Sequence, residues 1–224
     1  MPRAKLRLYF DMRSGFTYLA YVVTRRSSVF TECDISYVPA DMYALWKTCG
    51  NPGAWTTKNK PEWIVKSSAL WARKFNIPMN FPPEGFPKVS TTPVQQALCA
   101  VDVECPEKMP DVLDVIFDPF WVQQKPVFDI PVFTRTFEEV LGAELARKVL
   151  STAGTDEVKG MLEENTASAF KEGAFGLPWW VAENPAGEKE TFWGIDHMGL
   201  VVDHLGLQNP TAESMSGGGW GVML

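Results

Sequence analysis

The sequence contains few of the residues that metal and thiol chemistry use. Its 224 residues include only two histidines and four cysteines. The cysteines form no CxxC pair and have no histidine at ligand spacing: Cys33, Cys49, Cys99 and Cys105. The two histidines, His197 and His204, are seven residues apart, too far for a metal pair on adjacent helical turns. We therefore expect ordinary reduced thiols, with no metal site and no disulfide framework.

Long apolar runs and an excess of positive charge are also missing. No apolar run approaches the roughly 20 residues that cross a bilayer, and the amino terminus lacks the apolar core of a signal peptide. The formal net charge is −6, which argues against nucleic acid as the main partner because phosphate binding needs a basic face. These absences predict a soluble intracellular protein without a membrane span. They do not distinguish cytoplasm, mitochondrion and peroxisome.

The chain does have length and a clear order of patterns. With 46% hydrophobic residues, a chain of this size buries roughly 70% of the surface that its unfolded form exposes. One domain, or one domain with a large insertion, is the natural count. A strand, a helix and a strand come first, and two strands and a helix come last. These segments are residues 5–10, 16–23 and 33–38, then 179–182, 190–193 and 196–205.

The middle of the chain has helical periodicity. The predicted helices are residues 62–75, 92–103, 110–121, 136–150 and 156–171, the last capped by Asp156. Without them the order is βαβ-ββα, the thioredoxin topology. We expect a discontinuous thioredoxin-like domain, a helical insertion that covers the active end of the sheet, and a loose tail. Their bounds are residues 1–60 with 175–210, residues 61–174, and residues 211–224.

A hydroxyl replaces the thiol at the start of the first helix. Thioredoxin-like redox proteins carry CxxC between strand one and helix one, where this chain has Ser14-Gly15-Phe16-Thr17, so dithiol exchange is excluded there. The dipole and the N–H groups of a helix N-terminus favour an anion. Ser14 is placed to donate a hydrogen bond to a bound thiolate and lower its pKa. The simpler interpretation is that Ser14 only caps the helix.

A second motif lies near the carboxyl end. Phe175-Gly176-Leu177-Pro178 leads into the predicted hairpin, which ends in Gly194-Ile195-Asp196. A cis proline would let Leu177 present its backbone N–H and C=O to a peptide ligand like a neighbouring strand. Asp196 is either a helix cap or a carboxylate for the ammonium of a ligand. The tryptophans of the hairpin are more typical of a core than of a binding site: Trp179, Trp180 and Trp193.

A polar loop separates the first βαβ unit from the helices. It runs from Asn51 to Lys60, and its amides and ammonium groups are able to hold a carboxylate or a peptide backbone. On its own such a run is more often a solvated loop.

With these motifs, the chain resembles kappa-class glutathione transferases and the related 2-hydroxychromene-2-carboxylate isomerases. The resemblance covers roughly residues 5–207. It rests on Phe10-Asp11-x-x-Ser14, Gly50-Asn51, Asn59-Lys60, Phe75-Asn76-Ile77-Pro78, Gly173-Ala174-Phe175-Gly176-Leu177-Pro178 and Phe192-x-Gly194-x-Asp196. It implies an α/β fold, a DsbA-like thioredoxin fold with an inserted all-helical domain, that is usually dimeric and binds glutathione without a metal.

The resemblance also implies roles for individual residues. Ser14 would be the catalytic residue that stabilises the glutathione thiolate. Leu177 would pair its backbone with the cysteinyl part of glutathione, and Ile195 with Asp196 would hold the γ-glutamyl end. The complete set of implied glutathione contacts is Ser14, Asn51, Lys58, Asn59, Leu177, Pro178, Ile195 and Asp196.

The chain departs from the pattern of the family at several of these places. Gly15-Phe16 replaces Pro-Tyr, Arg13 replaces a small or apolar residue, and His197 replaces an arginine. Ile195 replaces a serine, so only its backbone N–H is able to contribute.

Three functions remain open. One is transfer of glutathione to a small hydrophobic electrophile, or reduction of a peroxide. The second is glutathione-dependent cis–trans isomerisation of a 2-hydroxychromene-2-carboxylate. The third is binding of glutathione or a peptide without catalysis. We expect a homodimer.

Overall fold

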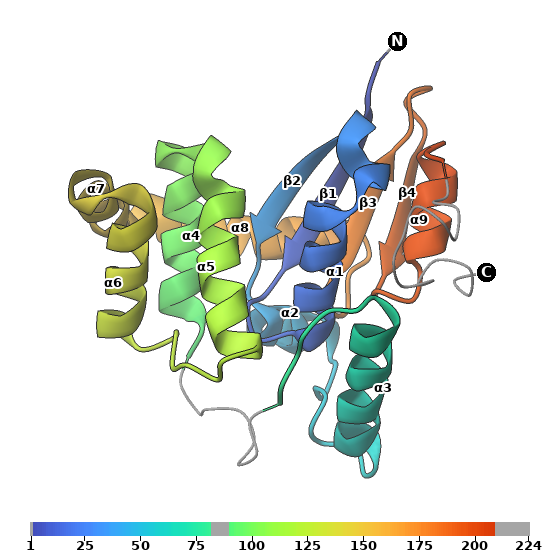
Figure 1. Cartoon of the computed structure of the whole chain (residues 1–224), viewed down its shortest axis with the longest axis horizontal. Coiled ribbons are helices and arrows are strands. Elements are labelled where there is room, and N and C mark those ends of the chain that lie inside the picture. Colours follow the sequence, from blue (N-terminus) through green and yellow to red (C-terminus); the bar gives the residue numbers. More distant parts are fainter. Residues whose placement is uncertain (1, 82–89, 209–224) are drawn as a thin grey trace.

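A four-stranded mixed sheet forms the centre of the computed structural model, which describes residues 2–81 and 90–208 (Figure 1). The strand order is β2-β1-β3-β4. β1 (Ala4–Phe10) pairs in parallel with β2 (Cys33–Pro39) and antiparallel with β3 (Trp179–Glu183). β3 in turn pairs antiparallel with β4 (Lys189–Trp193). The two halves of the sheet come from opposite ends of the chain, which confirms the predicted βαβ-ββα order.

β1 is one of the two inner strands, and both of its faces are covered. Leu6, Leu8 and Phe10 are fully buried and pack into the larger hydrophobic core. Tyr9 points to the opposite face and joins a second cluster. Successive side chains of a strand alternate between its faces, so β1 contributes to both cores.

Three helices outside the insertion cover the sheet. α1 (Gly15–Arg26) and α9 (Met198–His204) pack in the larger core. α2 (Met42–Cys49) places Met42 and Leu45 in the second cluster, beside Tyr9 of β1. A short 3-10 helix, Ser28–Glu32, precedes β2.

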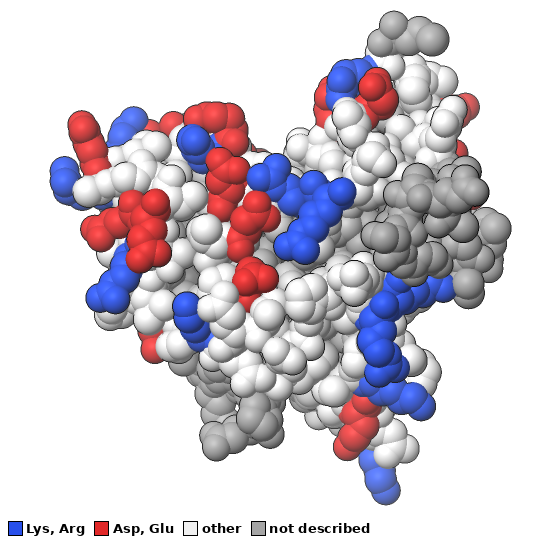
Figure 2. Space-filling view, viewed as in Figure 1, with Lys and Arg blue, Asp and Glu red and all other residues white. Residues whose placement is uncertain are grey.

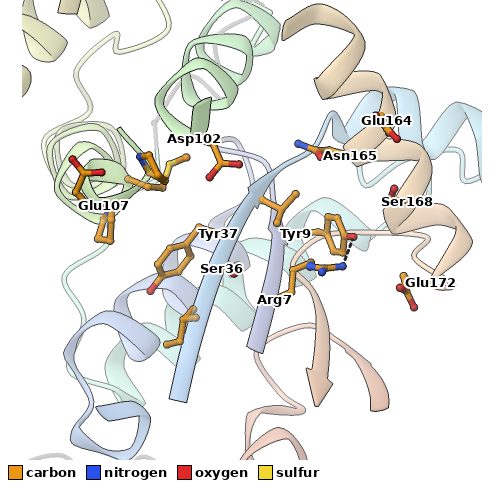
Figure 3. A pocket seen from close by; sticks show the side chains of 15 residues that line it. Arg7, Tyr9, Ser36, Tyr37, Asp102, Glu107, Glu164, Asn165, Ser168 and Glu172 are labelled. Carbon is orange, nitrogen blue, oxygen red and sulfur yellow. Dashed lines mark hydrogen bonds between the residues drawn. The ribbon is translucent and has the colours of Figure 1, made fainter. Parts of the chain in front are cut away.

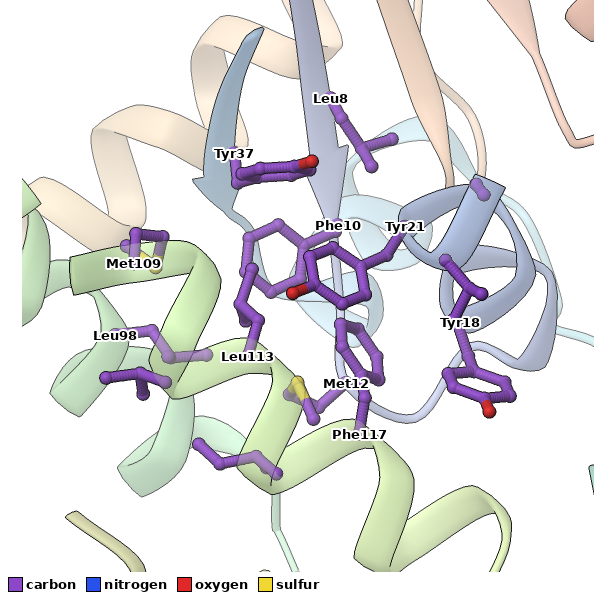
Figure 4. Packing of buried hydrophobic residues seen from close by; sticks show 14 of the residues in the cluster. Leu8, Phe10, Met12, Tyr18, Tyr21, Tyr37, Leu98, Met109, Leu113 and Phe117 are labelled. Carbon is purple, nitrogen blue, oxygen red and sulfur yellow. The ribbon is translucent and has the colours of Figure 1, made fainter. Parts of the chain in front are cut away.

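The insertion contains six helices within the described part of the chain. They are α3 (Lys60–Lys74), α4 (Thr92–Glu104), α5 (Met109–Trp121), α6 (Ile130–Leu141), α7 (Ala143–Ala153) and α8 (Asp156–Lys171), with a 3-10 turn at Pro106–Lys108. Figure 1 shows α4 to α7 beside the sheet, while α3 projects separately at the lower right. The core continues from the sheet into the insertion, since Phe117 of α5 packs against Phe10 and stacks with Tyr21 at 5.1 Å between ring centroids (Figure 4).

The single helix predicted over residues 136–150 is wrong. Two helices, α6 and α7, occupy this region and meet at Gly142. Gly142 has φ 80° and ψ 155°, a conformation that glycine adopts readily and that no helix continues through.

The predicted cap at Asp156 is wrong, and so is the interpretation of Asp196 as a helix cap. The hydroxyl of Thr155 caps α8, accepting a hydrogen bond from the N–H of Val158 at 3.3 Å, so Asp156 is the first helical residue. The last helix begins at Met198 with His197 at its N-cap, so Asp196 precedes the helix. Finally, α2 was not predicted, although Asp41 caps it by accepting from Tyr43 and Ala44.

Two further observations bear on the predicted organisation. The predicted loose tail, residues 211–224, lies outside the described residues. Within residues 2–81 and 90–208, no helix combines the length and the apolarity that a membrane crossing requires.

Candidate functional site

Ser14 lies at the start of α1 and caps that helix. Its Oγ accepts a hydrogen bond from the backbone N–H of Thr17 at 3.2 Å, which confirms the capping interpretation. The same hydroxyl donates to the backbone carbonyl of Leu177 at 3.0 Å. Ser14 is only 8% exposed. Capping uses the lone pairs of the hydroxyl and leaves its proton for a second partner, so the capping and ligand-binding roles are compatible.

The peptide bond between Leu177 and Pro178 is cis. The side chain of Leu177 is buried in the second cluster, which leaves its backbone to border the cavity. The carbonyl of Pro178 accepts from the N–H of Gly194 at 3.0 Å. This bond joins Pro178, directly before the hairpin, to Gly194, directly after it, so the two ends of the hairpin lie side by side.

Gly194 directs the chain out of β4 toward Asp196. Its φ of 82° lies in the left-handed region that favours glycine, and a Cβ there would collide with the Asp196 carboxylate. The side chain of Asp196 is 55% exposed, and its Oδ1 lies 3.5 Å from Nδ1 of His197. Ile195 is 1% exposed and packs in the core, so only its backbone is able to meet a ligand.

The polar loop approaches the cis-proline segment from the other side. The Nδ2 of Asn51 donates to the carbonyl of Phe175 at 2.8 Å, and its Oδ1 accepts from Gly53 at 2.9 Å. Lys60, the first residue of α3, borders the same cavity as Asn51. Lys58 and Asn59 are exposed, and neither belongs to the described lining of that cavity.

One cavity of about 390 Å³ brings these groups together. Its described lining includes the polar residues Ser14, Asn51, Lys60 and Asp196, and it includes Leu177 and Pro178 of the cis-proline segment. Eight of its described lining residues are aromatic: Phe16, Trp46, Trp55, Trp63, Trp71, Phe81, Phe175 and Trp193. An apolar hollow with a few convergent polar groups is the usual form of a small-molecule site.

Sequence reasoning missed part of this wall. Trp179 and Trp180 are buried, as predicted, but Trp193 is 44% exposed and borders the cavity. Of the predicted covering insertion, α3 and Phe81 reach the cavity among the described residues, whereas α4 to α7 lie beside the sheet. Lys60 was not singled out, although the Asn59-Lys60 pair contains it.

Side chains fill the space behind Gly15, one of the positions that departs from the family pattern. A Cβ at this position would lie 2.6 Å from the terminal methyl of Met79 and 3.1 Å from the ring of Trp121. Carbon atoms in contact normally stay at least 3.5 Å apart. Proline at position 15 would require Met79 and Trp121 to move.

A buried carboxylate lies directly before the Ser14 turn. Asp11 is fully buried, and its oxygens accept from the backbone N–H groups of Arg13 at 2.9 Å and Met42 at 3.1 Å. Burial raises the pKa of Asp11 to about 6. The two backbone hydrogen bonds oppose the rise, the nearby charge of Asp41 adds to it, and Arg13 also opposes it.

The cysteines lie outside this chemistry. All four are free, and burial raises the pKa of Cys33 and of Cys99 to about 12. A thiol with a raised pKa is a poor nucleophile. The described residues contain no group of three or more histidine, cysteine or acidic side chains arranged to hold a metal ion.

A larger hollow, of about 710 Å³, lies on the face of the sheet that carries Arg7 and Tyr9 (Figure 3). Arg7 donates to the hydroxyl of Tyr9 at 3.3 Å, and the wall includes Asp102 of α4 and Glu164 of α8. Its described lining includes none of the predicted glutathione contacts. The smaller cavity at Ser14 is therefore the candidate active site, because it combines a helix N-terminus, the cis-proline segment and charged residues of both signs.

Comparisons with known proteins identify relatives that match most of the chain. The DSBA-like thioredoxin domain matches residues 5–206. Glutathione S-transferase kappa 1 of Rattus norvegicus is 28% identical over 209 residues, which cover 92% of each chain. The 2-hydroxychromene-2-carboxylate isomerase of Sphingobium xenophagum is 25% identical over 208 residues, covering 88% of this chain and 95% of the isomerase.

A solved structure supports the fold. A 2-hydroxychromene-2-carboxylate isomerase structure matches 90% of this chain and 94% of its own with a TM-score of 0.72 at 20% identity. Together with the domain match, this confirms the predicted fold class, a DsbA-like thioredoxin fold with inserted helices.

Proposed function

The chain belongs to the DSBA-like thioredoxin domain family, and we propose that within it the chain is a glutathione transferase of kappa type. The observation that carries the proposal is the position of Ser14. Its hydroxyl stands at the N-terminus of α1, touches the Leu177 carbonyl, and borders an aromatic cavity. Two curated relatives that span nearly the whole chain are named a glutathione S-transferase and an isomerase, both enzymes.

Three contact points would hold glutathione along the cavity. The N–H and C=O of Leu177, beside Pro178, would pair with the cysteinyl residue as a neighbouring strand does. Asp196 and the N–H of Ile195 would hold the ammonium and carboxylate of the γ-glutamyl end. Asn51 and a loop cation would hold the glycyl end. The sequence pattern gives Lys58 or Asn59 as the loop contact, but Lys60 lines the cavity and Lys58 does not belong to its described lining, so we favour Lys60 over Lys58 as that cation.

Binding would release the Ser14 hydroxyl for catalysis. In the structure this hydroxyl donates to the carbonyl of Leu177. The cysteinyl N–H of glutathione would donate to that same carbonyl, so the hydroxyl could turn toward the sulfur. Its hydrogen bond and the N-terminus of α1 would both favour the thiolate over the thiol.

The thiolate is the nucleophile of the proposed reaction. Its sulfur forms a bond to an electrophilic carbon, the leaving group departs with the bonding electrons, and the thiol proton passes to solvent. The aromatic wall would stack against a flat apolar electrophile. Reduction of a peroxide would use the same sulfur, which attacks one peroxide oxygen and breaks the O–O bond, so that the sulfur becomes a sulfenic acid and the alkoxide leaves and takes up a proton. A second glutathione thiol would then attack the sulfenic acid, form the disulfide and release water.

Positive charge near the cavity suits an anionic ligand. Figure 2 shows Lys and Arg side chains gathered over α3, whose basic residues are Lys60, Lys66, Arg73 and Lys74 against one acid, Glu62. The whole chain has a net charge of −6. A local field of opposite sign to the rest of the surface would guide glutathione to this end of the molecule.

A second candidate is glutathione-dependent isomerisation. The 25% identical isomerase relative favours it, and the same thiolate would add to a conjugated bond, allow rotation, and leave. Incubation with a chromene carboxylate separates the two, because isomerisation consumes no glutathione whereas transfer consumes one molecule per turnover.

A third candidate is binding without turnover, which the replacements at Gly15, Phe16 and Ile195 favour. It predicts glutathione binding with no conjugation of any standard electrophile.

We further propose that the protein is a homodimer acting in detoxification. Light scattering in solution tests the dimer.

Replacement of Lys60 by methionine tests which of the two lysines, Lys58 or Lys60, holds the glycyl carboxylate of glutathione. We expect Lys60→Met to raise the KM for glutathione about tenfold, because a charge-assisted contact to the glycyl carboxylate is lost. Lys58→Met, which removes the same charge outside the cavity lining, is the matched control and should stay within about twofold of wild type. Steady-state kinetics at varied glutathione measures both. An equal rise in KM in the two variants would show that only the overall positive charge of this region matters. A rise confined to Lys58→Met would make Lys58, and not Lys60, the contact to the glycyl carboxylate.

A further inference from the structure

The Asp11 carboxylate joins three separate segments beside the site. One oxygen accepts from the N–H of Arg13, the residue before Ser14. The other accepts from the N–H of Met42, the first residue of α2, and from the hydroxyl of Thr91, before α4, at 3.4 Å. The turn that carries Ser14 is thus fastened to two helix N-termini through one side chain.

The same turn has a second backbone restraint that starts from Asp11. Its carbonyl accepts from the N–H of Ser14 at 3.0 Å. The neighbouring strand ends are fixed as well, because Gln95 of α4 donates to the carbonyls of Phe10 and Ala40, each at 2.9 Å. The strand ends are therefore held by neutral groups, and the turn between β1 and α1 is held by a carboxylate.

We propose that Asp11 is the positioning residue for Ser14, and that its ionised carboxylate holds the turn in the form that binds glutathione. This inference rests on the proposed function. An ionised carboxylate only accepts hydrogen bonds, so both of its oxygens satisfy N–H donors. A protonated carboxyl turns one oxygen into a donor, and the N–H facing it loses a good acceptor.

The charge state of Asp11 changes in a range where glutathione itself does not titrate strongly. The carboxyl groups of glutathione lose their protons well below pH 6, and the amine and thiol of glutathione titrate above it. The charged groups that act on Asp11 among the described residues are Asp41, before α2, and Arg13 on its own turn. α4 presents Thr91 and Gln95, which do not titrate.

The sign of the pH dependence follows from these groups. Because the pKa of Asp11 is about 6, the carboxyl is protonated below that pH and ionised above it. Affinity for glutathione should therefore fall as the pH drops through about 6. Asp11→Asn places an amide of the same shape in the turn and imitates the protonated form at every pH.

The test is calorimetric titration of S-methylglutathione, which has no thiol to titrate, from about pH 7.5 to about pH 5. We expect the wild-type Kd to rise about tenfold over this range, the change that one unit of pKa coupling gives. Asp11→Asn should bind about tenfold more weakly at the upper pH with no further change below it. Wild-type affinity in Asp11→Asn, or the full pH dependence retained in it, would overturn the proposal.

Asp41→Asn is the matched control. Asparagine keeps the cap of α2 and removes a negative charge near Asp11. The pH dependence should persist, with its midpoint at lower pH, because a like charge that raises the pKa of Asp11 is gone. A midpoint that moves to higher pH would contradict the assignment of the transition to Asp11.

A ligand-free measurement separates this proposal from the proposed function. The amide NMR resonances of Arg13, Ser14 and Thr17 should shift together in the wild type with one midpoint near the pKa of Asp11, and not in Asp11→Asn. If the wild type binds no S-methylglutathione, the proposed function fails, and these resonances still decide the inference. A common midpoint supports positioning by Asp11, and resonances of Ser14 and Thr17 that do not follow Arg13 overturn it.

Discussion

Replacement of Ser14 by alanine is expected to lower kcat/KM for conjugation of a standard aromatic electrophile about 10²- to 10³-fold. Removal of one preorganised donor to a developing or stabilised anion costs about this much. The hydroxyl is 8% exposed and stands at the N-terminus of α1, so water does not readily replace it. The thiolate absorbance of bound glutathione, followed against pH, should show the thiol pKa rising in Ser14→Ala.

Ser14→Thr is the control for that experiment. Threonine keeps a hydroxyl that both caps α1 and donates, so most activity and most of the thiolate signal should remain. Ser14→Ala also loses the cap, and thermal unfolding of each variant without ligand measures that separate cost, about 1 kcal/mol. Activity unchanged in Ser14→Ala would remove Ser14 from the mechanism, whatever the change in stability.

Replacement of Asp196 by asparagine is expected to weaken glutathione binding about tenfold to a hundredfold. The carboxylate follows Gly194, lines the cavity and is 55% exposed, and we propose that it pairs with the γ-glutamyl ammonium. Hydrogen bonds to a charged group contribute more than neutral ones. Calorimetric titration of glutathione into both proteins gives the ratio of Kd values.

A glutathione analogue without the γ-glutamyl amine makes this test specific. Wild type should bind the analogue more weakly than glutathione, and Asp196→Asn should bind the two with nearly equal affinity. The double comparison isolates the carboxylate–ammonium pair. If Asp196→Asn weakens the analogue as much as glutathione, Asp196 acts on the shape of the turn and not on the amine.

The sheet and its order could be predicted because strand signals depend on local sequence. Adjacent residues carry both the alternating pattern of β1 and the turn between β3 and β4, so a short stretch of sequence is enough to predict them. The strand order follows from the βαβ-ββα sequence of elements. Helix boundaries were harder to predict from the sequence. α2 has only eight residues, and the break between α6 and α7 depends on one backbone conformation at Gly142.

The site was predictable in part for the same reason. Ser14, Leu177 and Asp196 lie next to turns whose position the sequence marks, and the structure brings all three to one cavity. The position of Lys60 at the cavity was not predicted, because which lysine borders the cavity depends on where α3 begins, and Asn59 turns the chain there with φ 69°. Trp193 at the end of β4 was also missed, since the position of a cavity depends on contacts between distant segments.

The central claim is that this cavity binds glutathione, and thermal unfolding with and without glutathione tests it most directly. A ligand that binds only the folded state must stabilise that state, by about 2.7 kcal/mol at a concentration of about 100 times Kd. The account predicts that Tm rises with glutathione concentration in the wild type and rises much less in Asp196→Asn. A wild-type Tm that does not change up to millimolar glutathione would contradict it.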